Sequence, residues 1–427
     1  MDYKVRKDFK YLSGCIEIPP DKSISHRAVI FSTLASGKSI IKNFSDAQDP
    51  QTSLQICKNL GADIVVKKDS YIEVTSDGKL YPYNKNLNCS NSGTTMRLLS
   101  GILAGQNFNS ILTGDESLSK RPMGRIIEPL TLMGANIKSN NFHAPLEIQK
   151  SELHAIKYCS PIASAQVKSC ILLAGLFAQG TTEYTEPYLS RNHTEIMLKS
   201  MGANIRTNKN TTTIEKSELQ PLNIEIFGDI SSAAFFIVAA LIIPKSKIVL
   251  KNIGLNKTRA GIIEVVKKMN GNITILDKKI ICGEEVGDIQ IEYSPDLTGC
   301  EISGEIIPRL IDEIPVIALM ATQAKGQTII KDAQDLRNKE TDRIKTTVSE
   351  LKKLGAEIEE TIDGMIINGK TTLKGDTITD SYTDHRLAMT LYIAGLITEK
   401  EISIKNFEWI KISFPEFTKL VESLKIG

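Results

Sequence analysis

Pro19-Pro-Asp-Lys-Ser-Ile-Ser-His-Arg-Ala28 marks the point where an extended segment gives way to an apolar helix. Ser23 suits the N-cap of that helix, because its hydroxyl can accept from free backbone N–H groups. A helix start also carries partial positive charge and unpaired donors, and Lys22 and Arg27 add full charges there. Taken alone, the stretch is explained by a capped helix with two surface cations. Its layout recurs along the chain, and that repetition points to an anion site.

Length and composition place the chain among ordinary globular proteins. A chain of 427 residues exceeds what one hydrophobic core normally serves, so two or more domains are expected. The apolar share is 41%, the charged share 24%, and the formal net charge only +2. This balance gives no reason to expect nucleic acid or a membrane as a partner. Any anion site must therefore come from local clustering of charge.

Cysteine usage and the apolar runs indicate a reduced, cytoplasmic protein. The 7 cysteines occur singly, so neither a disulfide framework nor a zinc site is suggested. Residues 1–7 lack the apolar core of a signal peptide. The longest apolar run, Ala233 to Ile243, is too short to span a bilayer and is expected to form a buried helix.

One repeated signature is a helix end followed by Gly, Ala and a β-branched strand. The glycine fits a left-handed C-cap that turns the chain from helix into strand. A final helix without its strand is expected at Phe417 to Leu424. The clean copies and one degenerate copy, the fourth, lie at 60–64, 133–137, 201–205, 269–273 and 354–358.

A second signature is a small-residue-rich helix, a turn and a strand, repeated roughly every 70 residues. Six such units account for the whole length, and each reads as strand, helix, strand, helix and flanking strands. The spacing is too long for a helical solenoid. The copies lie at 34–43, 102–112, 176–183, 241–250, 320–330 and 394–404.

The starts of the six small-residue helices carry the candidate chemistry. Ser, Asn, Asp and Thr there are what helix caps require, but a cap does not require the Lys, Arg or Gln that most of them also have. If the units surround a pseudo-axis, these starts meet and build a polyanion site. They lie at 22–27, 91–97, 164–169, 228–233, 310–315 and 381–386.

Eight segments in this order resemble the enolpyruvyl transferase family, and within it the EPSP (5-enolpyruvylshikimate-3-phosphate) synthases. Ser164-Ala-Gln-Val-Lys168 is similar to the class II branch of the bacterial enzymes. Eight ordered motifs along nearly the whole chain are far more specific than one loop. The segments are 20–27, 91–97, 114–124, 164–169, 228–233, 310–313, 338–343 and 384–389.

The resemblance implies an α/β fold of two similar domains. Each would hold three repeated βαβαββ-type units in an inside-out α/β barrel, with two crossover strands near 16–20 and 225–228 joining the domains. Residues 20–227 would form the shikimate 3-phosphate side. Residues 1–19 and 228–427 would form the phosphoenolpyruvate and acid/base side. Hinge closure would exclude water from the site.

The implied reaction transfers the enolpyruvyl group of phosphoenolpyruvate to the 5-hydroxyl of shikimate 3-phosphate and releases phosphate. It is a step of the shikimate pathway to chorismate and aromatic amino acids, and it passes through a tetrahedral ketal. The chemistry needs an acid, a base and positive charge for phosphates and carboxylates. A monomer that acts on these small molecules without metal or cofactor is expected.

The resemblance also implies roles for individual residues. Asp312 would be the base at the 5-hydroxyl, Glu340 its acid/base partner, and Lys22 a third catalytic residue. Shikimate 3-phosphate would be bound by Lys22, Ser23, Arg27, Ser164, Gln166, Arg191, Asp312 and Lys339. Phosphoenolpyruvate would be bound by Lys22, Gly93, Arg121, Gln166, Arg343 and Arg386.

Alternatives to these roles remain open at the level of sequence. Asp312 and Glu313 can simply cap a helix, and Glu340 can be an i,i+3 partner of Arg343. Ala165 stands where some family members have a second serine, and a phosphate role for Lys411 is doubtful. His385 either transfers protons or orients its neighbours.

Two rival functions are less consistent with the sequence. The sister enzymes that act on UDP-N-acetylglucosamine usually carry a reactive Cys in the loop corresponding to 113–125, and this loop has none. A non-catalytic anion-binding protein on the same scaffold would be expected to lose the acid/base pair, yet Asp312 and Glu340 are both present.

Overall fold

The computed structural model divides into two compact units. Unit 1 comprises Met1–Pro19, Phe227–Lys279 and Glu285–Gly427, and unit 2 comprises Pro20–Ile226 and Ile280–Glu284. The structure describes residues 2–68 and 70–427, so Met1 and Asp69, which fall inside the two expected domains, lie outside the described residues. None of the helices in these ranges has both the length and the apolar character needed to cross a membrane.

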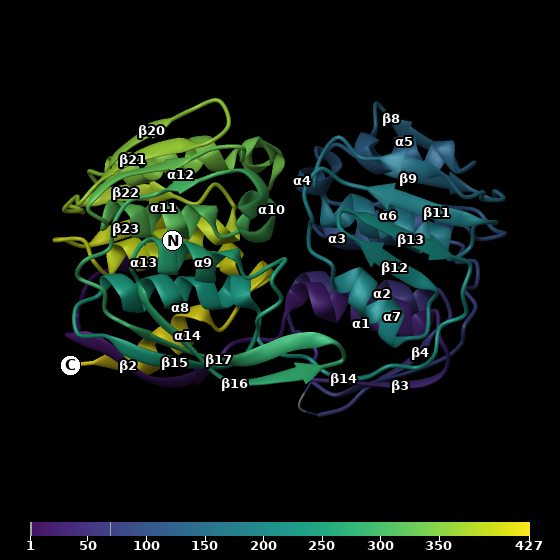
Figure 1. Cartoon of the computed structure of the whole chain (residues 1–427), viewed down its shortest axis with the longest axis horizontal. Coiled ribbons are helices and arrows are strands. Elements are labelled where there is room, and N and C mark those ends of the chain that lie inside the picture. The colour runs from purple at the N-terminus through teal and green to yellow at the C-terminus, as the bar shows by residue number, and fades with distance from the viewer. Residues whose placement is uncertain (1, 69) are drawn as a thin grey trace. The chain divides into compact units, whose positions relative to one another are not determined.

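Unit 2 alternates helices with short strands (Figure 1). Its helices are α1 (Lys22–Thr33), α2 (Gln48–Asn59), α3 (Gly93–Ala104), α4 (Glu116–Ser119), α5 (Gly124–Leu132), α6 (Ala165–Gly175) and α7 (His193–Ser200). Its strands are β3 (Ser36–Lys42), β4 (Asp63–Val66), β5 (Ile72–Asp77), β6 (Leu87–Asn88), β7 (Ser110–Thr113), β8 (Asn136–Asn140), β9 (His143–Gln149), β10 (Lys157–Cys159), β11 (Thr181–Thr185), β12 (Ile205–Asn208), β13 (Thr211–Glu215) and β14 (Asn223–Glu225).

Unit 1 has the same kind of alternation, with three added 3₁₀ turns. Its helices are α8 (Ile230–Ile242), α9 (Gly261–Lys268), α10 (Ile307–Leu310), α11 (Ile314–Thr322), α12 (Arg343–Lys353), α13 (His385–Gly395) and α14 (Phe417–Leu424), and the turns are η1 (Gly304–Ile306), η2 (Gln334–Asn338) and η3 (Phe407–Ile412). Its strands are β1 (Tyr3–Val5), β2 (Tyr11–Glu17), β15 (Lys247–Gly254), β16 (Asn272–Ile281), β17 (Glu284–Glu292), β18 (Glu301–Ile302), β19 (Gly326–Ile330), β20 (Glu357–Glu360), β21 (Met365–Gly369), β22 (Thr377–Asp380), β23 (Ile402–Lys405) and β24 (Lys425–Ile426). The tip of the β16–β17 hairpin, Ile280–Glu284, groups with unit 2.

Four of the sheets formed by the described residues repeat one strand topology, which confirms the repeated α/β units predicted from the sequence. In the sheet β6-β7-β9-β8, β6 and β7 run parallel and the other neighbours run antiparallel. The sheets β14-β3-β5-β4, β10-β11-β13-β12 and β18-β19-β21-β20 share this pattern. None of the sheets formed by the described residues closes on itself.

The small-residue helices form the interior of each unit. Every residue of α8 is buried, as predicted for the longest apolar run, and α11 and α13 are buried along their whole length. Helices buried on all sides are apolar all round and need sheets to cover them. In unit 2, α3 and α6 approach so closely that a Cβ on Gly101 would lie 2.1 Å from the carbonyl oxygen of Cys170. Only glycine fits at that crossing.

The helix-to-strand turns adopt the left-handed caps that the first signature predicts. Gly61, Gly134, Gly202 and Gly355 have φ values of 106°, 95°, 88° and 91°. In the degenerate copy the left-handed residue is Asn270, with φ of 63°, because asparagine tolerates this region better than other side chains. The last helix, α14, spans Phe417–Leu424 as predicted.

The N-cap of α1 differs from the prediction. Asp21, not Ser23, caps this helix, and its Oδ1 accepts from the backbone N–H of Ile24 at 2.9 Å. The helix begins at Lys22, so Ser23 already lies inside the first turn. Asp and Ser cap about equally well, and Asp21 directly follows Pro20, whose restricted backbone ends the extended segment.

Candidate active site

In unit 2, side chains from the first two turns of α1, α3 and α6 bind one another. Nη1 of Arg97 on α3 donates to Oε1 of Gln166 on α6 at 2.6 Å, and Nε2 of Gln166 donates to Oγ1 of Thr94 at 2.9 Å. Nη2 of Arg27 on α1 donates to Oγ of Ser169 on α6 at 3.0 Å. Three of the predicted helix starts are therefore brought together at one end of this unit.

Arg27 lies deeper than the sequence suggested. Its side chain is only 3% exposed. Nε donates to Oγ1 of Thr194 on α7 at 2.8 Å, and Nη1 donates to the carbonyl oxygen of Ser23 at 3.0 Å. With its bond to Ser169, Arg27 joins α1, α6 and α7, so much of its donor capacity is used inside the protein.

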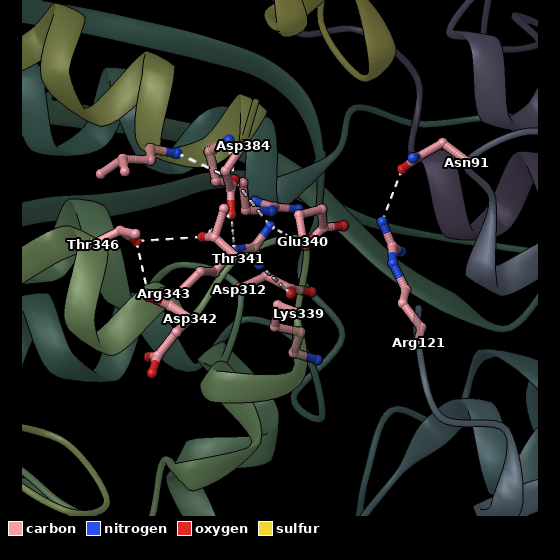
Figure 2. A network of polar contacts seen from close by, with 12 residues as sticks. Asn91, Arg121, Asp312, Lys339, Glu340, Thr341, Asp342, Arg343, Thr346 and Asp384 are labelled. Carbon is pink, nitrogen blue, oxygen red and sulfur yellow. Dashed lines mark hydrogen bonds and ion pairs between the residues drawn. The ribbon is translucent and has the colours of Figure 1, made fainter. Parts of the chain in front are cut away.

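Lys22 and Arg121 are accessible cations near the same helix starts. Nζ of Lys22 lies 3.0 Å from Oδ2 of Asp49, and the Lys22 side chain is 21% exposed. Nη2 of Arg121 donates to Oδ1 of Asn91 at 2.8 Å (Figure 2). A Cβ on Gly93 would lie 3.4 Å from Nη1 of Arg121, so this guanidinium lies against the first turn of α3.

A buried chain of hydrogen bonds connects α1, α2 and the cap of α3. Nδ1 of His26 lies 2.7 Å from Oγ of Ser53, which lies 2.7 Å from Oγ1 of Thr95, and that hydroxyl donates to Oγ of Ser92 at 2.7 Å. Burial, together with the charges of Lys22 and Arg27, lowers the pKa of His26 well below its ordinary value. His26 is therefore a neutral structural histidine at physiological pH.

Two further predicted residues stand at helix starts of unit 2. Ser164 is the N-cap of α6, but its hydroxyl makes no capping hydrogen bond and its side chain is half-buried. Arg191 is half-buried in the irregular segment before α7. Together with Lys22, Arg27 and Arg121, this arginine makes the predicted residues of unit 2 strongly cationic.

In unit 1, Arg343 lies among three carboxylates (Figure 2). Its Nε donates to Oδ2 of Asp384 at 2.7 Å, Nη2 lies 2.6 Å from Oε2 of Glu340, and Nη1 lies 3.3 Å from Oδ1 of Asp312. The Arg343 side chain is 2% exposed, whereas those of Asp312 and Glu340 are 17% and 21% exposed. The predicted acid/base pair therefore shares one guanidinium.

The charge of Arg343 is secured by its neighbours. Burial opposes the charge, but Asp384, Glu340 and Asp312 outweigh it and hold the pKa of Arg343 above its ordinary value. Asp384 is fully buried and also caps α13, because its Oδ1 accepts from the backbone N–H of Arg386 at 2.9 Å. A buried charge of this kind is strongly destabilising, by about 3–5 kcal/mol, when its partner is removed.

A second buried cluster surrounds the start of α13. Nη1 of Arg386 lies 3.7 Å from Oε1 of the buried Glu313, the residue before α11. Asp229, the N-cap of α8, accepts from Nη2 of Arg259 at 2.9 Å. Burial would raise the pKa of Asp229, but the charges of Arg259 and Arg386 lower it to about 2. The starts of α8, α11 and α13 thus carry interacting charges.

The remaining predicted residues of unit 1 lie at the edges of these clusters. Nζ of Lys339 lies 3.0 Å from Oδ2 of Asp335, and its side chain is 26% exposed. Glu340 forms the predicted i,i+3 pair with Arg343, although it precedes α12 and is not part of it. His385 is buried, and Lys411 is exposed on the last turn of η3.

Several charged residues of these clusters were not among those predicted from the sequence. Arg97, Asp229 and Asp384 fall within the quoted segments 91–97, 228–233 and 381–386, so a local signal was present for them. Arg259 had no such signal, because it contacts Asp229 across 30 residues of sequence.

The two units carry complementary chemistry. One presents cationic side chains at helix starts, where backbone donors favour anions. The other presents two partly exposed carboxylates on a shared arginine, a setting suited to proton transfer. These two features are typical of the class of enzymes that bind phosphorylated acids and use acid/base catalysis.

Comparisons with known proteins agree with this class. The family model of EPSP synthase (3-phosphoshikimate 1-carboxyvinyltransferase) matches residues 7–420. A 3-phosphoshikimate 1-carboxyvinyltransferase of Thermodesulfovibrio yellowstonii is 52% identical over 99% of both chains. One from Thermoanaerobacter sp. is 50% identical over 99% of this chain and 100% of its own. The solved EPSP synthase of Acinetobacter baumannii is 39% identical, with a TM-score of 0.89 over 100% of this chain and 98% of its own.

The chain belongs to the EPSP synthase family. This membership confirms the resemblance drawn from the eight segments, and with it the two-domain inside-out α/β fold of the enolpyruvyl transferases. Members of the family are shikimate-pathway enzymes that transfer the enolpyruvyl group of phosphoenolpyruvate to shikimate 3-phosphate.

Proposed function

We propose that this chain transfers the enolpyruvyl group of phosphoenolpyruvate to the 5-hydroxyl of shikimate 3-phosphate and releases phosphate. Family membership over residues 7–420 supports the activity. The observation that carries the mechanism is that Asp312 and Glu340 both pair with one buried guanidinium, that of Arg343.

The first half of the reaction is an addition. Asp312 accepts the proton of the 5-hydroxyl group. At the same time the 5-hydroxyl oxygen forms a bond to C2 of phosphoenolpyruvate. An acid, which we assign to Glu340, gives a proton to the C3 methylene, which becomes a methyl group, and a tetrahedral ketal results. A positioned acid and base each contribute about 10² to 10⁴-fold to such steps.

The second half is an elimination in the reverse sense. A base removes a proton from the new methyl group, the C2–O bond to phosphate breaks, and the enol ether double bond forms. Cations stabilise the departing phosphate, and we assign this task to Lys22, Arg121, Arg343 and Arg386. Lys22 and Arg121 are partly exposed near the helix starts of unit 2, which supports their part in this assignment.

Binding of shikimate 3-phosphate is assigned mainly to the cationic residues of unit 2. Arginine forks and helix-start donors match phosphate geometry. The hydroxyl of Ser164 makes no capping bond, which supports its use for a ligand. The assigned residues are Lys22, Ser23, Arg27, Ser164, Gln166 and Arg191, with Asp312 and Lys339 of unit 1; phosphoenolpyruvate is assigned to Lys22, Gly93, Arg121, Gln166, Arg343 and Arg386.

We also propose that the chain is a monomer in the reducing cytoplasm. The cysteines of the chain are free, which suits the cytoplasm. One chain supplies every residue in the assignment, so no second copy is needed. The net charge of +2 offers little attraction to nucleic acid.

Phosphate release tests the function. Purified chain is given phosphoenolpyruvate with shikimate 3-phosphate, or with UDP-N-acetylglucosamine as the control acceptor. Release is expected only with the first. Asp312→Asn is expected to lower kcat by about 10²-fold or more while both substrates still bind. The control variant Asp376→Asn removes an exposed pair with Lys400 and is expected to leave kcat unchanged. Equal release with the nucleotide sugar would overturn the proposal.

A further inference from the structure

A buried lysine connects α6 to the segment before α7. Nζ of Lys168 lies 2.7 Å from Oε1 of Glu186 and 2.8 Å from Oε1 of Glu195. It also donates to the carbonyl oxygen of Ser190 at 3.1 Å. The side chains of Lys168 and Glu186 are each 1% exposed and that of Glu195 is 6% exposed. The contacts of Lys168 are therefore made out of reach of bulk water.

The cluster fixes the backbone of Ser190 from both sides. Lys168 binds its carbonyl oxygen, and Oε1 of Glu186 accepts from its backbone N–H at 2.9 Å. Residues 186–192 form neither helix nor strand, so their path depends on such contacts. The next residue is Arg191. The cluster thus sets the position from which the Arg191 side chain departs.

Lys168 is also anchored to the start of α6. Its backbone N–H donates to the carbonyl oxygen of Ser164 at 2.9 Å, in the first turn that carries Gln166. One side chain therefore links the peptide beside Arg191 to the helix turn of Ser164 and Gln166. All three residues are assigned above to shikimate 3-phosphate.

Stability alone does not account for this arrangement. Well-packed apolar side chains in place of a buried charge cluster are often neutral or stabilising. The next residue, Ser169, already ties α6 to α7, because its Oγ lies 2.6 Å from Oγ1 of Thr194. Thr194 in turn accepts from Arg27. The helices are joined without Lys168, whereas the peptide before Arg191 is held by Lys168 and Glu186.

We propose that Lys168 is a positioning residue for shikimate 3-phosphate binding. With Glu186 and Glu195, it holds the Ser190–Arg191 peptide at the start of α6, so that Arg191, Ser164 and Gln166 act on the same phosphate. This inference rests on the proposed role of Arg191 in the transfer reaction.

Steady-state kinetics of Lys168→Met test the inference. The KM for shikimate 3-phosphate is expected to rise about tenfold or more, because small displacements of a binding group are costly. The KM for phosphoenolpyruvate and kcat are expected to stay within about twofold. Lys425→Met is the matched control, since Lys425 also pairs with two carboxylates, Asp8 at 3.0 Å and Glu422 at 2.7 Å. It is expected to leave every kinetic constant unchanged.

A second variant covers the case in which Lys168→Met fails to fold. This triple variant combines Lys168→Met with Glu186→Gln and Glu195→Gln. It removes the buried charges but keeps an acceptor for the Ser190 N–H. It is expected to fold, because no buried carboxylate is left without its cation. The selective rise in KM for shikimate 3-phosphate should persist. A folded variant, single or triple, with an unchanged KM would overturn the inference.

A double-mutant cycle separates positioning from general damage. If Lys168 acts through Arg191, Lys168→Met in the Arg191→Ala background should change the KM for shikimate 3-phosphate by less than about twofold. Additive effects would contradict the inference. If Arg191→Ala alone leaves this KM unchanged, the proposed role of Arg191 fails, and that result is distinct from a failure of Lys168 alone.

Discussion

Replacing Asp229 by asparagine should remove a pH-dependent part of the stability of unit 1. Asp229 is 4% exposed and caps α8 while pairing with Arg259. Asparagine keeps an acceptor for the cap, so the change acts mainly on charge. The folded-state pKa of Asp229 is about 2, against an ordinary value of 3.8. The difference corresponds to about 2 kcal/mol of stabilisation at neutral pH.

The direction of the pH effect follows from that depressed pKa. Because the folded-state value lies below the unfolded-state value, the stabilisation is fully present above about pH 4. It is lost as the pH falls through 2, and about half is gone by pH 3. The Asp229→Asn substitution should therefore lower the free energy of unfolding at pH 3 by about half as much as at pH 7.

Urea unfolding followed by tryptophan fluorescence measures this effect. The chain has a single tryptophan, Trp409, which lies in η3 of unit 1 and so reports on that unit. The midpoint of Asp229→Asn should approach that of the wild type as the pH is lowered from 7 to 3. Asp296→Asn, at an exposed pair with Lys325, is the control, and its unfolding midpoint should stay close to that of the wild type at either pH. An equal deficit of Asp229→Asn at pH 7 and pH 3 would refute the reasoning.

Three further outcomes are expected. Gly93→Ala should raise the KM for phosphoenolpyruvate several-fold, as measured by phosphate release, because the added Cβ would lie 2.8 Å from Nη1 of Arg97; an unchanged KM would contradict the tight fit. Gly101→Ala should lower the thermal unfolding midpoint of the purified chain, since its Cβ would overlap backbone of the facing helix. A thiol reagent should label Cys15 and Cys159 first in the native chain, because these two are exposed; rapid labelling of all thiols would show a looser fold.

Features set by local chemistry could be predicted from the sequence. The left-handed caps at Gly61 and Gly355 follow from glycine after a helix, and the start of α13 follows from Asp384 before His385. These signals lie within a few residues of their effect. The burial of α8 likewise follows from its unbroken apolar run.

Features set by packing between distant segments could not be predicted. Whether Arg27 faces a ligand or the protein depends on Thr194, which lies 167 residues away in sequence. The partners of Lys168 are Glu186 and Glu195, which follow β11 in the sequence, and their contacts depend in the same way on how α6 and α7 meet. The predicted N-cap of α1, Ser23, was wrong for the same kind of reason. Ser23 and Asp21 are equally good capping residues, and only the path of the backbone places Asp21 at the cap.

The pairing of β2 has a consequence for synthesis on the ribosome. Unit 2 is made almost wholly from one continuous stretch, Pro20–Ile226, so it can fold while the rest is still being translated. β2 can pair on one edge only after β15 has been synthesised. Its other edge pairs with β24, where Tyr11 lies opposite Ile426. At roughly 5–20 residues per second, that edge stays open for about 20–80 s. The nascent chain therefore exposes an unpaired edge of β2 until β24 is synthesised, and chaperones that shield strand edges should matter most in that interval.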